Sequence, residues 1–283
     1  MQLFQNIYKY IFSMRLLHLF IILLILVTTN TLAQNFKRII SLSPAATFNL
    51  MELGSVDKIV GCTKFCELGE NEDLVVASAI SMNIERVIAL KPDLVIYTTM
   101  FKPNQIERLT QFGIRTELFK SPKDWKETCD QFIRLGELVS QKKKAEHYID
   151  SLEQLMNKVT QSIPKNEKQK IFMEIGAKPL FTAVPNTFMH DYIVVLGGVN
   201  IANDQTSGTI SRERVLMKNP DIIILVTMGT VSKSEKQVWE SYTDLNATKN
   251  NKIITIDADL ACQPTPYNFL NTIIELNKLL YGK

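Results

Sequence analysis

Histidine and cysteine are both scarce in this chain of 283 residues, which contains three histidines and four cysteines. His18 lies in an N-terminal segment that we expect to be removed, His147 falls on a predicted long helix, and only His190 adjoins a predicted loop. A site for a bare zinc or manganese ion needs several imidazole, thiolate or carboxylate groups that converge on one point. We therefore expect no metal ion held directly by protein side chains, and we interpret His190 as a helix-start residue.

The chain also lacks the short motifs of common enzyme classes. It contains no Gly-x-Ser-x-Gly elbow, no Gly-x-x-x-x-Gly-Lys loop for phosphates and no Gly-x-Gly-x-x-Gly after the first predicted strand. Its charged residues make up 22% of the chain and nearly balance, with a net charge of +3, so no concentrated basic face for nucleic acid is indicated. These absences favour a protein that is not an enzyme and binds no nucleic acid.

Acidic residues are absent before Glu52, and this N-terminal segment has the pattern of a secretory signal peptide. An apolar run over residues 16–27, interrupted only by His18, is followed by small residues that end at Ala33. The run is short for a membrane span of about 20 residues. We expect cleavage after Ala33 and a freely diffusing protein in a periplasm; an uncleaved membrane anchor is the alternative. No cysteine follows the run closely, so no lipid anchor is indicated.

The four cysteines permit two disulfides in an oxidising compartment, but the sequence does not choose among the three pairings. They are Cys62, Cys66, Cys129 and Cys262. Because the chain has an export signal, a buried or disulfide-bonded role is favoured over metal ligation.

One pattern occurs twice in the chain. Residues 85–96 and 213–224 both read Glu-Arg-Val, four further residues, Pro-Asp, and then an apolar run of strand length. Each copy predicts a short helix, ended by the proline, that leads into a buried strand. We therefore predict an α/β protein with two similar lobes, each a central sheet flanked by helices. The expected segments are a signal peptide over residues 1–33, a first lobe over 34–122, a helical linker over 123–168 and a second lobe over 169–283.

A long amphipathic helix is predicted over residues 141–161, within the linker. It would span roughly 30 Å, at about 1.5 Å per residue, and could bridge the two lobes. The ligand cleft is then expected between the lobes, where loops follow the carboxyl ends of the strands. In the first lobe these loops contain Ser43, Pro44, Phe65, Cys66, Met100 and Phe101. For Met100 and Phe101, packing against the next helix is an equally good interpretation.

Two glutamates occupy equivalent places in the repeated pattern. Glu85 and Glu213 both fall in the first turn of a predicted helix, where the helix dipole stabilises a carboxylate. This effect alone could account for them. In a protein with two similar lobes, however, one carboxylate on each lobe could be bound by paired arginines of a two-fold partner.

Residues 82–96 resemble the signature of the periplasmic binding proteins for vitamin B12 and iron complexes, the helical-backbone class that serves ABC importers. Three further stretches support the resemblance: residues 38–44, residues 197–201 and residues 211–213. The similarity covers nearly all of the chain after the leader. These motifs identify the class and leave the ligand open.

This resemblance implies two lobes joined by a long helix, a ligand held without chemistry, and permease docking through Glu85 and Glu213. In this family the cleft is lined by aromatic and polar side chains, and Phe65, Phe181, Asp259 and Gln263 fall at matching places. The chain departs from the B12 binder at three aromatic positions, where it has Ala79, Thr98 and Ser207. It also places Cys66 and Cys262 in cleft-facing loops, where a disulfide between them would clamp the lobes together.

We therefore interpret the chain as a monomeric periplasmic solute-binding protein of an ABC importer, with no cofactor of its own. Its expected ligand is a metal chelate, either an iron complex (siderophore or haem) or a cobalamin-like corrinoid. Its expected partners are an ABC permease and the ATPase of that permease. The alternatives are an exported metal chaperone or enzyme on the same scaffold, and a membrane-anchored interaction protein.

Overall fold

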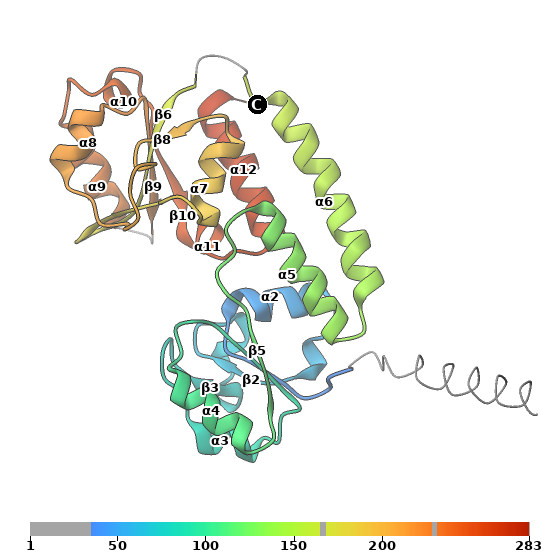
Figure 1. Ribbon diagram of the computed structural model, residues 1–283. Coiled ribbons are helices and arrows are strands. Elements are labelled where there is room, and N and C mark those ends of the chain that lie inside the picture. The colour runs from blue at the N-terminus through green and yellow to red at the C-terminus, as the bar shows by residue number, and fades with distance from the viewer. Residues whose placement is uncertain (1–34, 165–167, 228–230, 283) are drawn as a thin grey trace, which may run out of the picture. The chain divides into compact units, whose positions relative to one another are not determined.

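The computed structural model describes residues 35–164, 168–227 and 231–282 (Figure 1). The predicted signal peptide and its cleavage point after Ala33 lie outside the described residues. From Phe36 onward the chain forms one compact unit. Within it are two separate five-stranded sheets, which confirms the predicted α/β class with two similar lobes.

The first sheet is entirely parallel, with strand order β3-β2-β1-β4-β5. Its strands are β1 (Ile39–Ser41), β2 (Ile59–Thr63), β3 (Val75–Ala77), β4 (Leu94–Tyr97) and β5 (Arg115–Leu118). The helices of this lobe are α2 (Pro44–Glu52), α3 (Ile84–Ala89) and α4 (Pro103–Gln111), with short 3₁₀ turns at Val56–Lys58, Glu67–Glu70 and Glu72–Leu74.

The second sheet has the order β10-β9-β6-β7, with β8 also paired to β6, and only the β6–β7 pair is antiparallel. Its strands are β6 (Lys170–Ala177), β7 (Leu180–Thr182), β8 (Val199–Asn200), β9 (Ile222–Thr227) and β10 (Ile253–Asp257). Its helices are α7 (Phe188–Val195), α8 (Arg212–Lys218), α9 (Val231–Glu240), α10 (Asn246–Lys249), α11 (Ala258–Ala261) and α12 (Pro266–Tyr281).

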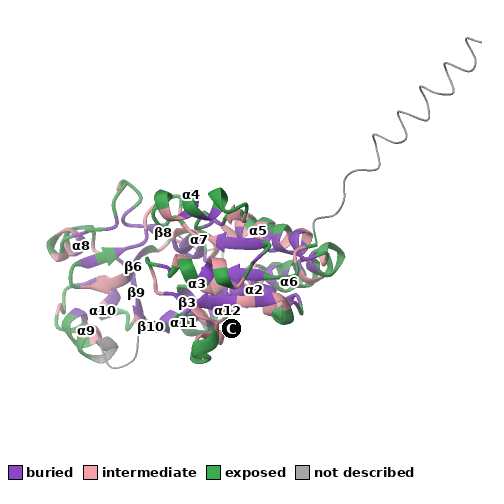
Figure 2. Ribbon diagram, turned by 90° about the horizontal axis from the view of Figure 1, so that it is seen from below, coloured by how far each residue is buried: buried purple, intermediate pink, exposed green. Residues whose placement is uncertain are grey.

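Both sheets are covered by side chains on both faces, as continuous apolar strands require. Ile39 and Ile40 are adjacent in β1 but belong to different core clusters, because successive side chains point to opposite faces. Phe172 and Met173 in β6 separate the second core in the same way. Buried residues therefore concentrate in the strands, while α4 and α8 carry mostly exposed or half-buried residues (Figure 2).

Two consecutive helices, α5 (Trp125–Leu138) and α6 (Lys142–Ser162), connect the lobes (Figure 1). Ala145 and Ile149, in the first half of α6, pack into the core of the first lobe. Leu152 and Met156, in its second half, pack into the core of the second lobe. The predicted bridging helix over residues 141–161 is thus confirmed, and its bounds differ by one residue. The expected domain boundaries at residues 122 and 168 stay predictions.

The repeated Pro-Asp pair has a structural role in each lobe. The carboxylate of Asp93 accepts hydrogen bonds from the backbone N–H groups of Lys37 (2.8 Å) and Arg38 (3.0 Å), just before β1. The carboxylate of Asp221 accepts one from the backbone N–H of Lys170 (2.8 Å), where β6 begins. These bonds tie together the starts of neighbouring strands, which explains why the pattern recurs.

Candidate functional site

A cavity of about 240 Å³ is lined by residues of both lobes. Its first-lobe side is formed by segments that follow β1, β4 and β5, including Ser43, Pro44 and Met100. Its second-lobe side is formed by residues 262–264, which follow α11. Loops at the carboxyl ends of parallel strands meet at one sheet edge, which is where open α/β sheets bind ligands.

A second cavity, of about 210 Å³, lies at the carboxyl ends of β6, β9 and β10. Its lining includes Glu174, Thr227, Glu235 and Cys262. Cys262 also lines the first cavity, so the two cavities are neighbours. We refer to these two cavities together as the cleft.

Ser43 lines the first cavity but is mainly occupied with its own helix. Its hydroxyl oxygen accepts a hydrogen bond from the backbone N–H of Ala46 (3.3 Å) and thereby caps α2, whose first residue is Pro44. Only 6% of Ser43 is exposed. The cap fixes the loop after β1, and Pro44 is the more accessible of the two residues to a ligand.

Three predicted ligand contacts carry large exposed apolar side chains. Met100 lines the first cavity and is 60% exposed. Phe65, 55% exposed, follows the carboxyl end of β2, and the Nζ atom of Lys64 lies 4.9 Å from its ring centroid. Phe181, 43% exposed, lies in the short strand β7, with its ring packed over Gly208. Neither Phe65 nor Phe181 lines either cavity, so both residues stay proposed ligand contacts near the cleft.

For Phe101 the structure differs from the prediction. A hydrogen bond from its backbone N–H to the carbonyl of Thr98 (3.2 Å) turns the chain back toward the first lobe. The ring is then buried in the same core cluster as Ile106 and Leu109 of α4. Phe101 therefore belongs to the core, and Met100 is the exposed member of this pair.

Cys66 is also buried and does not line the cleft. Its Sγ accepts a hydrogen bond from Thr47 Oγ1 (3.2 Å), and a further hydrogen bond joins it to Thr63 Oγ1 (3.2 Å). A hydrogen bond with the thiol of Cys62 lowers the pKa of Cys66, against the effect of burial. Cys62 and Cys66 are therefore a buried thiol pair beneath the loop that carries Phe65.

All four cysteines are free thiols, and Cys262 is exposed. The expected disulfide between Cys66 and Cys262 is thus not formed, because Cys66 is enclosed by its own lobe. Of the two polar residues expected near Cys262, Gln263 lines the first cavity. Asp259 is exposed on α11 and does not line the cleft.

The two repeated glutamates occupy matching positions. Glu85 is the second residue of α3 and Glu213 is the second residue of α8, and both are exposed. Each helix is capped by a side-chain oxygen, from Asn83 in α3 and from Ser211 in α8. Hydrogen bonds from the helix backbone and from Ser211 lower the pKa of Glu213. Since α3 lies in one lobe and α8 in the other, each lobe presents one such carboxylate (Figure 1).

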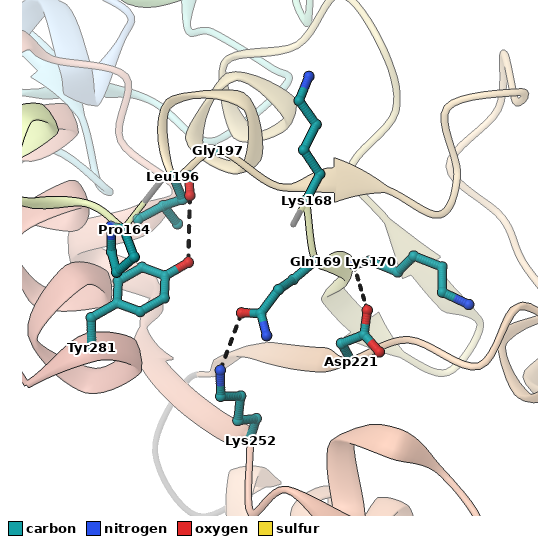
Figure 3. Close-up of a pocket in the computed structure, with 9 residues that line it drawn as sticks. All are labelled: Pro164, Lys168, Gln169, Lys170, Leu196, Gly197, Asp221, Lys252 and Tyr281. Atoms are coloured by element: carbon teal, nitrogen blue, oxygen red, sulfur yellow. Dashed lines mark hydrogen bonds between the residues drawn. The ribbon is translucent and has the colours of Figure 1, made fainter. Parts of the chain in front are cut away.

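A larger cavity, of about 660 Å³, lies at the opposite edge of the second sheet, near the starts of β6 and β10 (Figure 3). Several of its polar side chains are hydrogen-bonded within the protein. Lys252 Nζ donates to Gln169 Oε1 (3.1 Å), and the hydroxyl of Tyr281 donates to the carbonyl of Leu196 (3.5 Å). Because it lies at the amino ends of the strands and draws on one lobe only, we do not consider it the candidate ligand site.

The charged side chains of the second cavity were missed by the sequence interpretation. Glu174 lies on β6 and is only 4% exposed, and burial raises its pKa to about 7. Its Oε2 atom accepts a hydrogen bond from Trp239 Nε1 (2.6 Å). The signal was present in the sequence, because a carboxylate within the apolar run 171–175 is unusual for a central strand.

A family model described as "Periplasmic binding protein" matches residues 39–260. The chain is 28% identical over 261 residues to an uncharacterized ABC transporter substrate-binding lipoprotein, YvrC, of Bacillus subtilis (strain 168), and the match covers 89% of this chain and 82% of that protein. It is also 28% identical over 206 residues to the vitamin B12-binding protein of Yersinia pseudotuberculosis serotype O:3 (strain YPIII), with 71% of this chain and 72% of that protein covered.

A solved structure from Staphylococcus epidermidis ATCC 12228 superposes on this chain with a TM-score of 0.74 at 29% sequence identity. The match covers 87% of this chain and 99% of that protein, which is described as a possible iron-binding (periplasmic solute-binding) protein. These relatives are substrate-binding proteins rather than enzymes. Within the part of the chain that the structure describes, no helix is both long and apolar enough to span a membrane.

Proposed function

Because this chain belongs to the periplasmic binding protein family, we propose that it captures a metal chelate in the cleft and delivers it to the permease of an ABC importer. The chelate is an iron complex (siderophore or haem) or a cobalamin-like corrinoid. The relatives named for vitamin B12 and for iron support this range. The metal arrives as part of the ligand, and the protein needs no cofactor of its own.

One observation carries this proposal. The first cavity is lined by strand-end loops of the first lobe and by residues 262–264 of the second lobe, so a ligand there would contact both lobes. The exposed side chain of Met100 provides apolar surface in this cavity, and the exposed rings of Phe65 and Phe181 are proposed as further contacts. A flat or bulky chelate would bury this surface without any covalent step.

The ligand is tested by titrating the purified protein with cyanocobalamin, haemin and ferric siderophores, followed by absorbance and tryptophan fluorescence. We expect saturable one-to-one binding of at least one of them. The variant Met100→Ala should weaken that binding without changing the fold, because the side chain is exposed in the cleft. Absence of binding by every member of the panel would contradict the proposed ligand class.

We also propose that Glu85 and Glu213 bind arginines of the permease, whose two-fold arrangement would match the two lobes. Replacing both glutamates by alanine should leave ligand affinity nearly unchanged, since neither residue lines the cleft. Ligand uptake by cells that carry the cognate permease and its ATPase should stop. The matched control replaces Glu107 and Glu240 by alanine. Both are exposed glutamates on helices, one in each lobe. Uptake that survives the Glu85 and Glu213 changes would refute the docking role.

The proposed location is the periplasm, reached through a leader cleaved after Ala33, and the mature protein is proposed to be monomeric. The intact mass of the protein purified from the periplasmic fraction tests the cleavage, and sedimentation tests the monomer. A mass that includes residues 1–33 would favour the membrane-anchored alternative. Catalytic turnover, or a stoichiometric bare metal after purification, would favour the enzyme or chaperone alternative.

A further inference from the structure

The second cavity contains two carboxylates, Glu174 on β6 and Glu235 on α9, in an otherwise mainly apolar lining. They belong to segments about 60 residues apart, which the fold brings to the same edge of the second sheet. The cavity adjoins the first one through Cys262. A chelate held between the lobes would therefore present part of its periphery to these two side chains.

The charges of the two carboxylates are compensated differently. Glu235 forms an ion pair with Arg212 Nη2, and the guanidinium of Arg212 stacks on Trp239, with Cζ 4.4 Å from the ring centroid. Glu174 receives only the N–H of Trp239 on Oε2, and its Oε1 accepts no hydrogen bond from any described residue. Arg212 does not line the cavity, so its charge is not offered to a ligand. Among the described residues of the lining, the carboxylate without an ion-pair partner is therefore that of Glu174.

We propose that Glu174 and Glu235 form a subsite for an N–H group of the ligand, so that the cleft selects a chelate with amide or amine side arms over one with carboxylates. This inference rests on the proposed function and narrows its ligand class. An N–H group would satisfy the free oxygen of Glu174. A ligand carboxylate there, such as a propionate of haemin, would meet like charge and would be rejected.

The protonation of Glu174 gives this subsite a measurable signature. Burial raises the pKa of Glu174 to about 7, so the group is mostly protonated at pH 6 and mostly ionised at pH 8. An N–H donor binds the ionised form better, so ligand binding releases a proton and the dissociation constant should rise about tenfold from pH 8 to pH 6. Among the described residues, the other charged or titratable groups at this cavity are Glu235 with its partner Arg212, and Cys262, whose pKa is raised to about 11 by desolvation and by the nearby Asp259 and Asp257.

The experiment measures dissociation constants for cyanocobalamin (amide arms), ferrioxamine B (an amine arm) and haemin (carboxylate arms) at pH 6, 7 and 8. It compares the unmodified protein, Glu174→Gln, and the exposed control Glu107→Gln. We expect cyanocobalamin or ferrioxamine B to bind more tightly than haemin. The dissociation constant of the tighter ligand should rise about tenfold from pH 8 to pH 6. Glu174→Gln should remove the pH effect, while its amide oxygen can still accept the hydrogen bond from Trp239. The control Glu107→Gln should show the same pH effect as the unmodified protein. If Glu174 had a purely structural role, the pH profile of binding would be the same in Glu174→Gln as in the unmodified protein.

A second variant covers the case in which Glu174→Gln does not fold. Glu235→Gln removes a negative charge from the lining of the cavity, so haemin should gain affinity relative to cyanocobalamin. Tightest binding of haemin by the unmodified protein, or an unchanged pH profile in Glu174→Gln, would overturn the subsite and leave the transport function standing. If the unmodified protein binds none of the three chelates or other ferric siderophores, the proposed ligand class fails, and the inference fails with it.

Discussion

Glu174 should also control how the stability of the free protein depends on pH, and Glu174→Gln isolates this effect without any ligand. The pKa of this carboxyl is about 7 in the folded protein, because burial disfavours the charged form, against an ordinary value of 4.5. The folded state therefore holds the proton more tightly than the unfolded state does. The resulting stability is fully present below pH 4.5 and is lost as the pH rises to about 7.

The size of the effect follows from the two pKa values. At about 1.4 kcal/mol per pKa unit, the difference between the folded and unfolded pKa values of Glu174 corresponds to about 3 kcal/mol of stability. Most of this should be lost between pH 5 and pH 8. Glutamine is close in shape to a protonated glutamate and does not ionise. The variant should therefore be nearly as stable as the unmodified protein at pH 5 and more stable by up to about 3 kcal/mol at pH 8.

Urea unfolding followed by far-UV circular dichroism at pH 5, 6, 7 and 8 measures this difference. His190, whose pKa is lowered by burial, and Asp191, whose pKa is raised by burial, contribute to both proteins and cancel in the comparison. Glu107→Gln, at an exposed site, should follow the unmodified protein at every pH. Parallel stability curves for Glu174→Gln and the unmodified protein would show that the carboxyl is not held in a desolvated environment, and would refute the reasoning.

Three further outcomes are expected from the packing of single residues. Gly208→Ala should displace the ring of Phe181, because a Cβ at this position would overlap the ring. Since the ring is exposed and can move, the cost should be about 1 kcal/mol or less, and a crystal structure of the variant with the ring unmoved would contradict this. Alkylation followed by mass spectrometry should label Cys262 alone in the folded protein, and faster as the pH rises toward its pKa of about 11; equal labelling of the other cysteines before unfolding would contradict their burial. Ile149→Ala, which opens a space beneath the bridging helix, should lower the free energy of unfolding by about 2–5 kcal/mol in denaturant titrations, and a loss below about 1 kcal/mol would show that the helix is loosely packed.

The backbone plan could be predicted from the sequence because it depends on local signals. The period of apolar residues predicted α6 to within one residue at each end. The repeated Pro-Asp pattern predicted two similar lobes, because in each copy the proline follows and ends a short helix and the aspartate ties the starts of two neighbouring strands.

The directions of individual side chains could not be predicted in the same way. Met100 and Phe101 are adjacent, apolar and in the same loop, yet one is exposed in the cleft and the other is buried. The difference comes from one backbone hydrogen bond, to the carbonyl of Thr98, that closes the turn. Cys66 was also expected to face the cleft, because it lies in a loop after a strand. Its side chain is instead enclosed by Thr47 and Thr63.

The sequence by itself determined the elements and the two lobes, because hydrophobic period, helix caps and prolines act over a few residues, and it also predicted the edge of each sheet at which we propose that the ligand binds. Only the tertiary structure decided which side chains meet at that edge. Glu174 and Trp239 are 65 residues apart, and their contact depends on the register of β6 beside β9 and on how α9 packs over them. Such contacts depend on long-range packing, so the composition of the ligand site emerges only when the whole lobe is folded.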